Sequence, residues 1–555
     1  MCSKTRHAVE RAARDIDGPH CVCMNPAAPP LESPWAPLRQ PVFRMLWSVW
    51  LTANICMWMN DVAAAWMMTS LTTSPVMVAL VQSASTLPVF FLGLPSGALA
   101  DILDRRKYFI FTQFWVATVG VLMCVVTLSG HMVAPLLLLL TFANGIGLAM
   151  RWPVFSAVIP ELIPKAQLPA ALALNGVAMN TSRIFGPILA GALIASAGSA
   201  YVFALNAALS VICGFVIMRW RTEPKVSALP AERFFGAIRV GVRHVRESAG
   251  MRAILLRITT FFLQAIALTS LLPLVAKQLP DGGAGTFTLL LASMGSGAVV
   301  AALSMARIRA VMDGDVLVRN GSLIQAATMV VVAFAPNIWV AAPAMMLNGV
   351  AVISVANSLS VAAQLALPNW VRARGMSVYQ MALMGGGGIG AAVWGQVATF
   401  TDVRTSLIIA SVGGTLAMVG VLKRSPRGLS EHDDLTPSQE WKPPVMPVAI
   451  EGHEGPVLTT IEYLIDPSHA EDFLAVMRET RSSRLRQGAL SCELFRDGTV
   501  PGRYLEHMLD ESWVEHLRRF DRVTAYDVAL RNRRLALHIG DEPPRVSRCI
   551  AEAMD

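Results

Sequence analysis

The chain has 555 residues, of which 54% are hydrophobic and only 15% are charged, and its formal net charge is +8. Soluble proteins normally carry about 25% charged residues, so this composition argues against a purely soluble enzyme. The basic residues lie between apolar segments and form no patch on a soluble domain, which argues against nucleic-acid binding. The same placement is typical of a protein that crosses a membrane many times.

The N-terminal segment and the cysteines indicate neither a metal site nor a cofactor. Residues 1–40 are polar and Pro-rich and lack the short apolar core of a signal peptide, so we expect a disordered cytoplasmic tail. The eight cysteines are scattered. The close pair Cys21 and Cys23 has no second Cys/His cluster in the tail that would complete a metal site.

Twelve apolar stretches are long enough to cross the hydrocarbon, which needs about 20 residues. They form two groups of six, at 41–220 and 253–424, separated by a polar cytoplasmic loop at 221–252. This six-plus-six plan predicts an all-α polytopic membrane protein. The expected spans are 43–70, 75–99, 108–129, 132–154, 169–197, 200–220, 253–278, 285–306, 319–335, 338–366, 375–400 and 404–423.

Lys and Arg residues are concentrated in the loops on one side of these spans. That side includes Arg105 to Lys107 and Arg372, whereas the loops on the other side hold only Lys277 and Arg404. The positive-inside rule therefore places both termini in the cytoplasm. We expect a multi-pass protein of the bacterial inner membrane.

The loop between the two groups contains an amphipathic segment at 234–246. Its apolar residues follow a helical period, and Arg239, Arg243 and Arg246 lie on another face. This pattern predicts a helix that lies on the inner leaflet. A calmodulin-like partner is the alternative.

The polar C-terminal region contains a second, soluble domain. Residues 425–456 are rich in proline and charge and predict a linker. Residues 457–555 follow a β-α-β-β-α pattern, which predicts an α+β, ferredoxin-like sheet. No nucleophile–base pair or metal spacing emerges, so we expect this domain to assist folding, dimerisation or sensing. The side chains that could form a site are His507, Trp513, His516 and Arg522.

The segment 97–107, GALADILDRRK, resembles the Gly-x-Leu-Ala-Asp-x-x-x-Arg-Arg-Lys signature of the major facilitator superfamily. The resemblance implies two six-helix bundles that rock about a central cavity. Gly97 permits close helix contact, Asp101 can accept hydrogen bonds at a neighbouring helix N-terminus, and Arg105 and Arg106 lie at the anionic leaflet. We expect a charge lock that holds the conformation closed to the cytoplasm.

The fifth expected span contains RIFGPILAG at 183–191, which resembles the Gly-Pro motif in the fifth span of antiporters of that superfamily. The resemblance implies export. Pro187 removes a backbone hydrogen bond and kinks the helix, whereas Gly186 and Gly191 let another helix approach.

The segment LPNWVRARG at 367–375 and the Gly-rich stretch after it resemble the transmembrane secretion effector group, which includes enterobactin exporters and drug exporters. Residues 457–555 are similar to antibiotic-biosynthesis-monooxygenase-like domains. The glycines at 385–388 predict tight helix packing or a hinge, because each glycine destabilises a helix by about 1 kcal/mol.

Two ionisable residues inside spans, Asp61 and Arg183, are candidates for proton coupling, because a charge at mid-membrane costs roughly 2.5–3.5 kcal/mol. They lie about 27 Å and about 21 Å along helices that both start at the cytoplasm, so we expect an ion pair or a carboxylate that exchanges a proton beside an arginine. A purely structural pair is the alternative. Candidate substrate-cavity residues are Asn54, Trp58, Asn144 and Asn348.

Together these features predict a secondary exporter that exchanges protons for a small amphipathic molecule, such as a drug, a siderophore or a secondary metabolite. The sequence has no nucleotide-binding loop, which argues against ATP hydrolysis as the drive. The partners we expect are the substrate, protons, the lipid bilayer and a second copy bound through the C-terminal domain. The alternative is a membrane-tethered, monooxygenase-like enzyme.

Overall fold

The computed structural model describes residues 35–164, 167–220, 234–280, 282–368, 370–424, 434–438, 444, 446 and 450–552. The expected tail lies outside the described residues except for 35–40, as do much of the linker and the first part of the loop at 221–252. Cys21 and Cys23 are likewise outside them.

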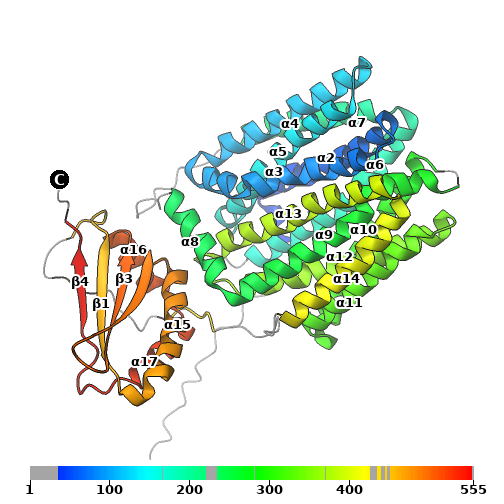
Figure 1. Ribbon diagram of the computed structural model, residues 1–555. Helices are drawn as coiled ribbons and strands as arrows, with labels where there is room; N and C mark the ends of the chain where they lie inside the picture. The colour runs from blue at the N-terminus through cyan, green and yellow to red at the C-terminus, as the bar shows by residue number, and fades with distance from the viewer. Residues whose placement is uncertain are drawn as a thin grey trace, which may run out of the picture.

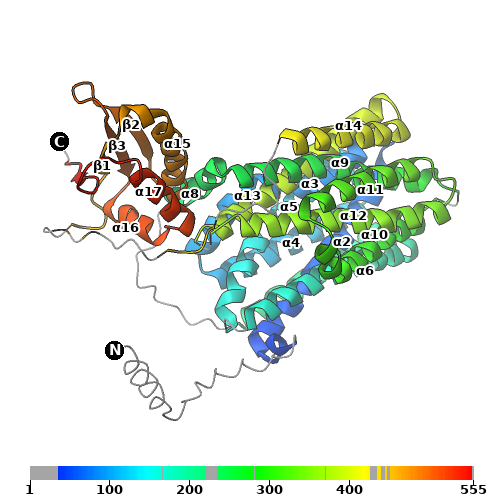
Figure 2. The ribbon, with the colours of Figure 1, turned by 90° about the horizontal axis from the view of Figure 1, so that it is seen from below.

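In the described part of the chain, twelve long helices pack side by side and are preceded by one 3-10 turn, Ala36–Arg39 (Figures 1 and 2). The N-terminal half consists of α2 (Pro41–Leu71), α3 (Pro75–Ile102), α4 (Arg105–Leu128), α5 (Ala134–Leu162), α6 (Leu168–Ser196) and α7 (Ser199–Met218). The C-terminal half consists of α9 (Ala249–Gln278), α10 (Ala284–Val311), α11 (Gly314–Ala333), α12 (Ile338–Leu365), α13 (Arg372–Phe400) and α14 (Val403–Arg424).

Ten of the helices in the described part of the chain are long and apolar enough to cross a membrane. The other two, α2 and α13, have 31 and 29 residues but a more polar or Gly-rich composition. Arg44 and Asp61 contribute to this in α2, and the run Gly385–Gly388 does so in α13. By length and composition alone, the structure thus supports ten of the twelve expected spans.

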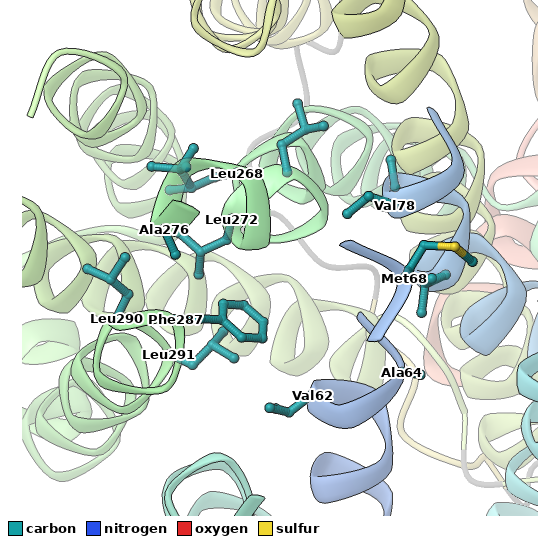
Figure 3. Packing of buried hydrophobic residues seen from close by; sticks show 14 of the residues in the cluster. Val62, Ala64, Met68, Val78, Leu268, Leu272, Ala276, Phe287, Leu290 and Leu291 are labelled. Carbon is teal, nitrogen blue, oxygen red and sulfur yellow. The ribbon is translucent and has the colours of Figure 1, made fainter. Parts of the chain in front are cut away.

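Among the described residues, the hydrophobic cores of the two halves merge at one end of the bundle and not at the other. We call it the sealed end, where α2 and α9 end and α3 and α10 begin. Here one continuous core joins both halves, and Figure 3 shows members of it from α2, α3, α9 and α10. They are Val62, Ala64, Met68, Val78, Leu268, Leu272, Ala276, Phe287, Leu290 and Leu291.

Near the other end, which we call the domain end because the C-terminal domain lies there, the cores are separate (Figure 1). Two clusters, one around Phe109 and Val158 and one around Trp50 and Phe155, contain only residues of the N-terminal half and its flanks. A third, around Ile258, draws on the C-terminal half and α8 (Phe234–Glu247). The bundle is therefore sealed at one end and divided at the other.

The Gly-rich part of α13 packs tightly against α3 of the other half. A Cβ at Gly388 would lie 2.9 Å from the Leu87 side chain, and Ser83 Oγ donates to the Gly388 carbonyl at 2.6 Å. A Cβ at Gly386 would also lie 2.8 Å from the Thr259 carbonyl oxygen of α9. Of the two roles expected for this glycine run, the structure supports tight packing.

The C-terminal domain contains a four-stranded antiparallel sheet in the order β2-β3-β1-β4. Its strands are β1 (Val457–Leu464), β2 (Ser491–Arg496), β3 (Arg503–Asp510) and β4 (Val546–Ile550), and its helices are α15 (Ala470–Gln487), α16 (Trp513–Asp521) and α17 (Ala525–Leu535). The sheet pattern contains the expected elements and adds β4. Inward-facing Tyr463 and Tyr504 pack on Phe473 of α15, which holds this helix against the sheet.

The amphipathic helix α8, which we expected on the inner leaflet, lies between the bundle and the C-terminal domain and contacts both (Figures 1 and 2). Val240 and Val245 are buried, and Val245 belongs to the core of the C-terminal half. Arg243 donates to the carbonyls of Ala489 and Leu490, at 2.8 Å each. Amphipathicity was predicted correctly, and protein buries Val240 and Val245 of the apolar face, whereas Val242 is 41% exposed.

The contact between α8 and the C-terminal domain also includes the aromatic ring of Trp370. His244 lies edge-on to Trp370, with ring centroids 5.4 Å apart, and its Nδ1 is 3.1 Å from the Arg486 carbonyl oxygen. On the domain side, the Arg522 guanidinium lies 4.7 Å from the Trp370 ring centroid. Burial lowers the pKa of His244 to about 4, so the ring is neutral at pH 7.

Candidate transport pathway and gating residues

The structure places Asp61 and Arg183 on neighbouring helices but does not pair them. Asp61 Oδ1, on α2, accepts a hydrogen bond from Ser85 Oγ of α3 at 2.9 Å. The Arg183 guanidinium, on α6, lies 5.4 Å from the ring centroid of Trp58 of α2. Among the described residues, no ion pair joins Asp61 to Arg183, so the expected pair is not formed in this conformation.

Trp58 and Asp61 are one helical turn apart on α2 and so lie on neighbouring positions of one face. The next residues toward the sealed end, Met59 and Val62, belong to the core shared by both halves. The indole Nε1 of Trp58 is buried and has no hydrogen-bond partner among the described residues. The Trp58–Arg183 stack therefore marks the boundary between the sealed and the divided parts of the bundle.

The two glycines of the Gly-Pro motif serve different contacts. A Cβ at Gly186 would overlap the Cβ of Trp58, so this glycine lets α6 approach α2 within the N-terminal half. A Cβ at Gly191 would overlap the side chain of Thr288 of α10, so this glycine permits contact between the halves. Pro187 lies between them, inside α6.

The expected gating motif spans the α3–α4 connection. Gly97 and Asp101 are in the last turns of α3, and their side chains lie outside the described residues. Asp104 caps α4, because its Oδ1 accepts from the backbone N–H groups of Arg106 and Lys107 at 2.9 and 3.2 Å. An N-cap carboxylate satisfies free backbone donors at the positive end of the helix dipole.

The two arginines of this motif lie at the start of α4. Arg106 Nη2 donates to the Met218 carbonyl, at the C-terminal end of α7, at 2.5 Å. A cation suits this position because the last carbonyls of a helix lack intrahelical donors. Both groups belong to the N-terminal half, so this contact does not bridge the halves, and Arg105 stays a predicted lock residue.

The candidate cavity residues differ in how their polar groups are used. Asn54 Nδ2 donates to the Trp50 carbonyl of its own helix at 2.7 Å. Asn348 Nδ2 donates to Thr328 Oγ1 at 3.0 Å and so ties α12 to α11. Asn144 is buried, and its Oδ1 has no partner in the described part of the chain.

Sequence reasoning missed two buried arginines. Arg151 of α5 is 4% exposed, donates from Nη1 to the Ala53 carbonyl at 3.2 Å and stacks 5.4 Å from the Trp50 ring centroid. Arg257 of α9 is 2% exposed and forms an ion pair with Asp315 at 2.6 Å. Both lie inside expected spans, so the rule that singled out Arg183 also applied to them.

A third missed residue, Lys277, bridges the halves at the sealed end. Its Nζ donates to the Thr69 carbonyl, in the last turn of α2, at 2.5 Å and lies 5.7 Å from the Trp66 ring centroid. Trp66 in turn stacks on Phe287 of α10 with centroids 6.0 Å apart. A cation is favourable at a helix C-terminus, and these contacts exist only while the two halves touch here.

This fold is shared by membrane transporters. The crystal structure of the nucleoside transporter NupG aligns with a TM-score of 0.56 and 14% identity over 69% of this chain and 98% of that chain. A bacterial homologue of the human lysosomal transporter Spinster gives a TM-score of 0.53 and 15% identity over 70% of this chain and 96% of that chain. Residues 32–555 match the Transmembrane secretion effector family, and the chain belongs to this family of major facilitator transporters.

The curated relatives include transporters and efflux proteins of bacteria. The Staphyloferrin A transporter of Staphylococcus aureus is 23% identical over 45% of this chain and 63% of its own length. Macrolide efflux protein A of Streptococcus pyogenes is 22% identical over 47% of this chain and 65% of its own length. The chain thus spans somewhat less than two thirds of these two relatives. The family and the shared fold indicate a transporter and not an enzyme.

Proposed function

We propose that the protein is a secondary active exporter that exchanges protons for a small amphipathic molecule. The observation that carries this proposal is the unequal division of the core, which is continuous across both halves at the sealed end and separate at the domain end. A transporter that works by alternating access needs two halves that meet at one end at a time. The described conformation corresponds to the state that is open at the domain end.

The loops at the domain end carry most of the Lys and Arg residues of the bundle, which supports a cytoplasmic location of this end. The conformation is then inward-facing, and both termini lie in the cytoplasm of a bacterial cell. The lengths of α2 and α13, and their packing against α6 and α3, support twelve spans. The sheet order of the C-terminal domain supports a ferredoxin-like fold.

Proton coupling is assigned to Asp61, with Arg183 as its alternating partner. In the inward-facing state the Asp61 carboxylate is held by Ser85, away from Arg183. Both residues lie at the boundary of the sealed core, where opening of the sealed end must change the helix contacts. We expect Asp61 to alternate between a proton and Arg183 as this happens, because a carboxylate in the membrane must be paired or protonated.

The substrate class follows from the relatives and from the pathway. One relative is named as a macrolide efflux protein, and another as a transporter of staphyloferrin A. Trp58 at the boundary of the sealed core is an aromatic surface, which suits an amphipathic molecule. The C-terminal domain would assist as a docked accessory domain, and a dimer would use the sheet face that α15 to α17 leave uncovered.

Transport by the purified full-length chain in proteoliposomes tests this proposal. A pH gradient should drive accumulation of a macrolide or a siderophore against its concentration gradient, and a protonophore should abolish it. Accumulation that needs ATP, or that survives the protonophore unchanged, would contradict the proposal. Size-exclusion chromatography with light scattering tests the dimer independently.

A further inference from the structure

Three residues on neighbouring strands of the C-terminal domain form a row beneath α16. The strand register places Thr459 of β1 opposite Met508 of β3 on one side and opposite Arg548 of β4 on the other. Thr459 and Met508 are fully buried, and Arg548 is partly exposed on the edge strand. From α16, Arg519 contacts Met508 and His516 contacts Arg548.

Hydrogen-bond donors in this row outnumber the acceptors. Thr459 Oγ1 and Arg519 Nε are both buried and have no hydrogen-bond partner in the described part of the domain. Arg519 is 6% exposed, its Nη1 contacts the Met508 sulfur, and its Nε forms an ion pair with Asp510 Oδ2 at 3.7 Å, which is too long for a hydrogen bond. Burial lowers the pKa of this guanidinium to about 10, yet it remains charged at pH 7.

Both carboxylates near Arg519 in the described part of the domain are already engaged, Glu506 by Arg484 and Asp510 by His516. Arg548 Nε donates to His516 Nε2 at 3.2 Å, so the other ring nitrogen, Nδ1, carries the proton and donates to Asp510 Oδ2 at 2.7 Å. Burial lowers the pKa of His516, which keeps the ring neutral and able to accept from Arg548. The Asp510 carboxylate therefore serves both His516 and Arg519, and Arg548 reaches it only through His516.

A buried donor without an acceptor destabilises a protein by about 1–3 kcal/mol, and a buried charge needs a partner. Because three donor-bearing side chains from β1, β4 and α16 converge here, we propose that this site binds a small oxyanion, carboxylate or phosphate in chemistry, held by Thr459, Arg519 and Arg548. Guanidinium groups bind such oxyanions through paired N–H donors. The oxyanion enters from the β4 edge, where Arg548 is partly exposed.

His516 and Asp510 act as positioning residues. The Asp510 carboxylate fixes the tautomer of His516, and the acceptor nitrogen of His516 holds Arg548 by its Nε. The remaining nitrogens of Arg548 are then directed to the oxyanion. This arrangement makes binding depend on a neutral His516, so affinity should fall when the imidazole is protonated at low pH.

Calorimetric titration of the detergent-solubilised full-length chain tests the site, with acetate, citrate, phosphate and sulfate as probes and chloride as the ionic-strength control. The wild type should bind at least one oxyanion saturably, and that oxyanion should raise the thermal midpoint. Thr459→Val, which replaces the hydroxyl by a methyl of similar size, and Arg548→Gln should each weaken binding at least tenfold. Arg533→Gln is the matched control, because Arg533 is an exposed arginine of the same domain paired with Glu479.

Two results would overturn the proposal. The first is no saturable binding of any of the four oxyanions by the wild type. The second is binding by Thr459→Val and Arg548→Gln with wild-type affinity. If Arg548→Gln does not fold, Thr459→Val decides alone, because loss of an unpartnered hydroxyl leaves the free domain at least as stable. Transport is measured separately, so failure here leaves the exporter proposal standing.

Discussion

Replacing Gly191 by Ala should weaken the sealed end without weakening the helix. Gly191 of α6 faces Thr288 of α10 across the two halves, and an added Cβ would overlap the Oγ1, Cβ and Cγ2 atoms of Thr288. Alanine is favoured over glycine in a helix interior by about 1 kcal/mol. The substitution therefore stabilises the helical conformation of α6 and destabilises only the packing of α6 against α10.

The size of the energetic penalty in Gly191→Ala depends on how far the Thr288 side chain can move. Its side chain is 9% exposed, and its Oγ1 donates to the Ala284 carbonyl at 2.8 Å. Overpacking at such a site costs about 1–3 kcal/mol. A penalty of about 2 kcal/mol applies only while the halves are in contact at the sealed end. It lowers the ratio of molecules with this contact to molecules without it by a factor of about 30.

Double electron–electron resonance can measure this shift. Spin labels at Ser70 and Gln278, exposed on opposite halves at the sealed end, should show a longer distance in Gly191→Ala. Gly176→Ala is the matched control, because a Cβ at Gly176 on the same helix meets nothing within 4 Å. Adding Thr288→Ala should restore the wild-type distance. A wild-type distance distribution in Gly191→Ala alone would refute the assigned contact.

Three further predictions concern Lys277, Trp370 and His244. Lys277→Met should shift the spin-label populations about fivefold toward molecules whose halves have separated at the sealed end. A charged hydrogen bond and a cation–π contact at an exposed site are together worth about 1 kcal/mol. Unchanged populations would show that the Lys277 contacts do not hold the halves together. Trp370→Ala should release the C-terminal domain from sedimented membranes after cleavage at a protease site inserted in residues 425–433, whereas Trp339→Ala, at an 83% exposed position, should retain it. Docking should also weaken as the pH falls from 6.5 toward 4, because the buried His244, with its pKa lowered to about 4, gains a proton more readily once it is undocked. His244→Gln should abolish this pH dependence, and a wild-type domain that stays bound equally at pH 7 and pH 4.5 would contradict the role of His244.

Sequence patterns predicted the helical bundle because apolar length is a local property. Ten helices meet the criterion of length and composition, whereas α2 and α13 carry the polar residues and glycines that serve contacts between helices. The amphipathic period of α8 was also evident in the sequence, but the same period is expected whether the apolar face packs on lipid or on protein. Only the fold shows that Arg243 meets the carbonyls at the end of α15.

The position of each candidate residue along its helix was predicted, but the direction of its side chain was not. Position along a helix follows from residue number, and Asp61 and Arg183 do lie within the long helices α2 and α6. The direction of each side chain depends on helix rotation, which turns Asp61 toward Ser85 and stacks Arg183 on Trp58. β4 was missed because it is a short edge strand of five residues with a mixed pattern.

Asp61→Asn provides the most direct test of coupling. In proteoliposomes that contain the full-length chain, the variant should lose accumulation of substrate against a gradient while it keeps downhill exchange, because an amide can bond to Ser85 but cannot carry a proton. Asp61→Glu should keep part of both activities. If Asp61→Asn still accumulates substrate uphill, and a protonophore still abolishes that accumulation, the proton takes another route and Asp61 is structural.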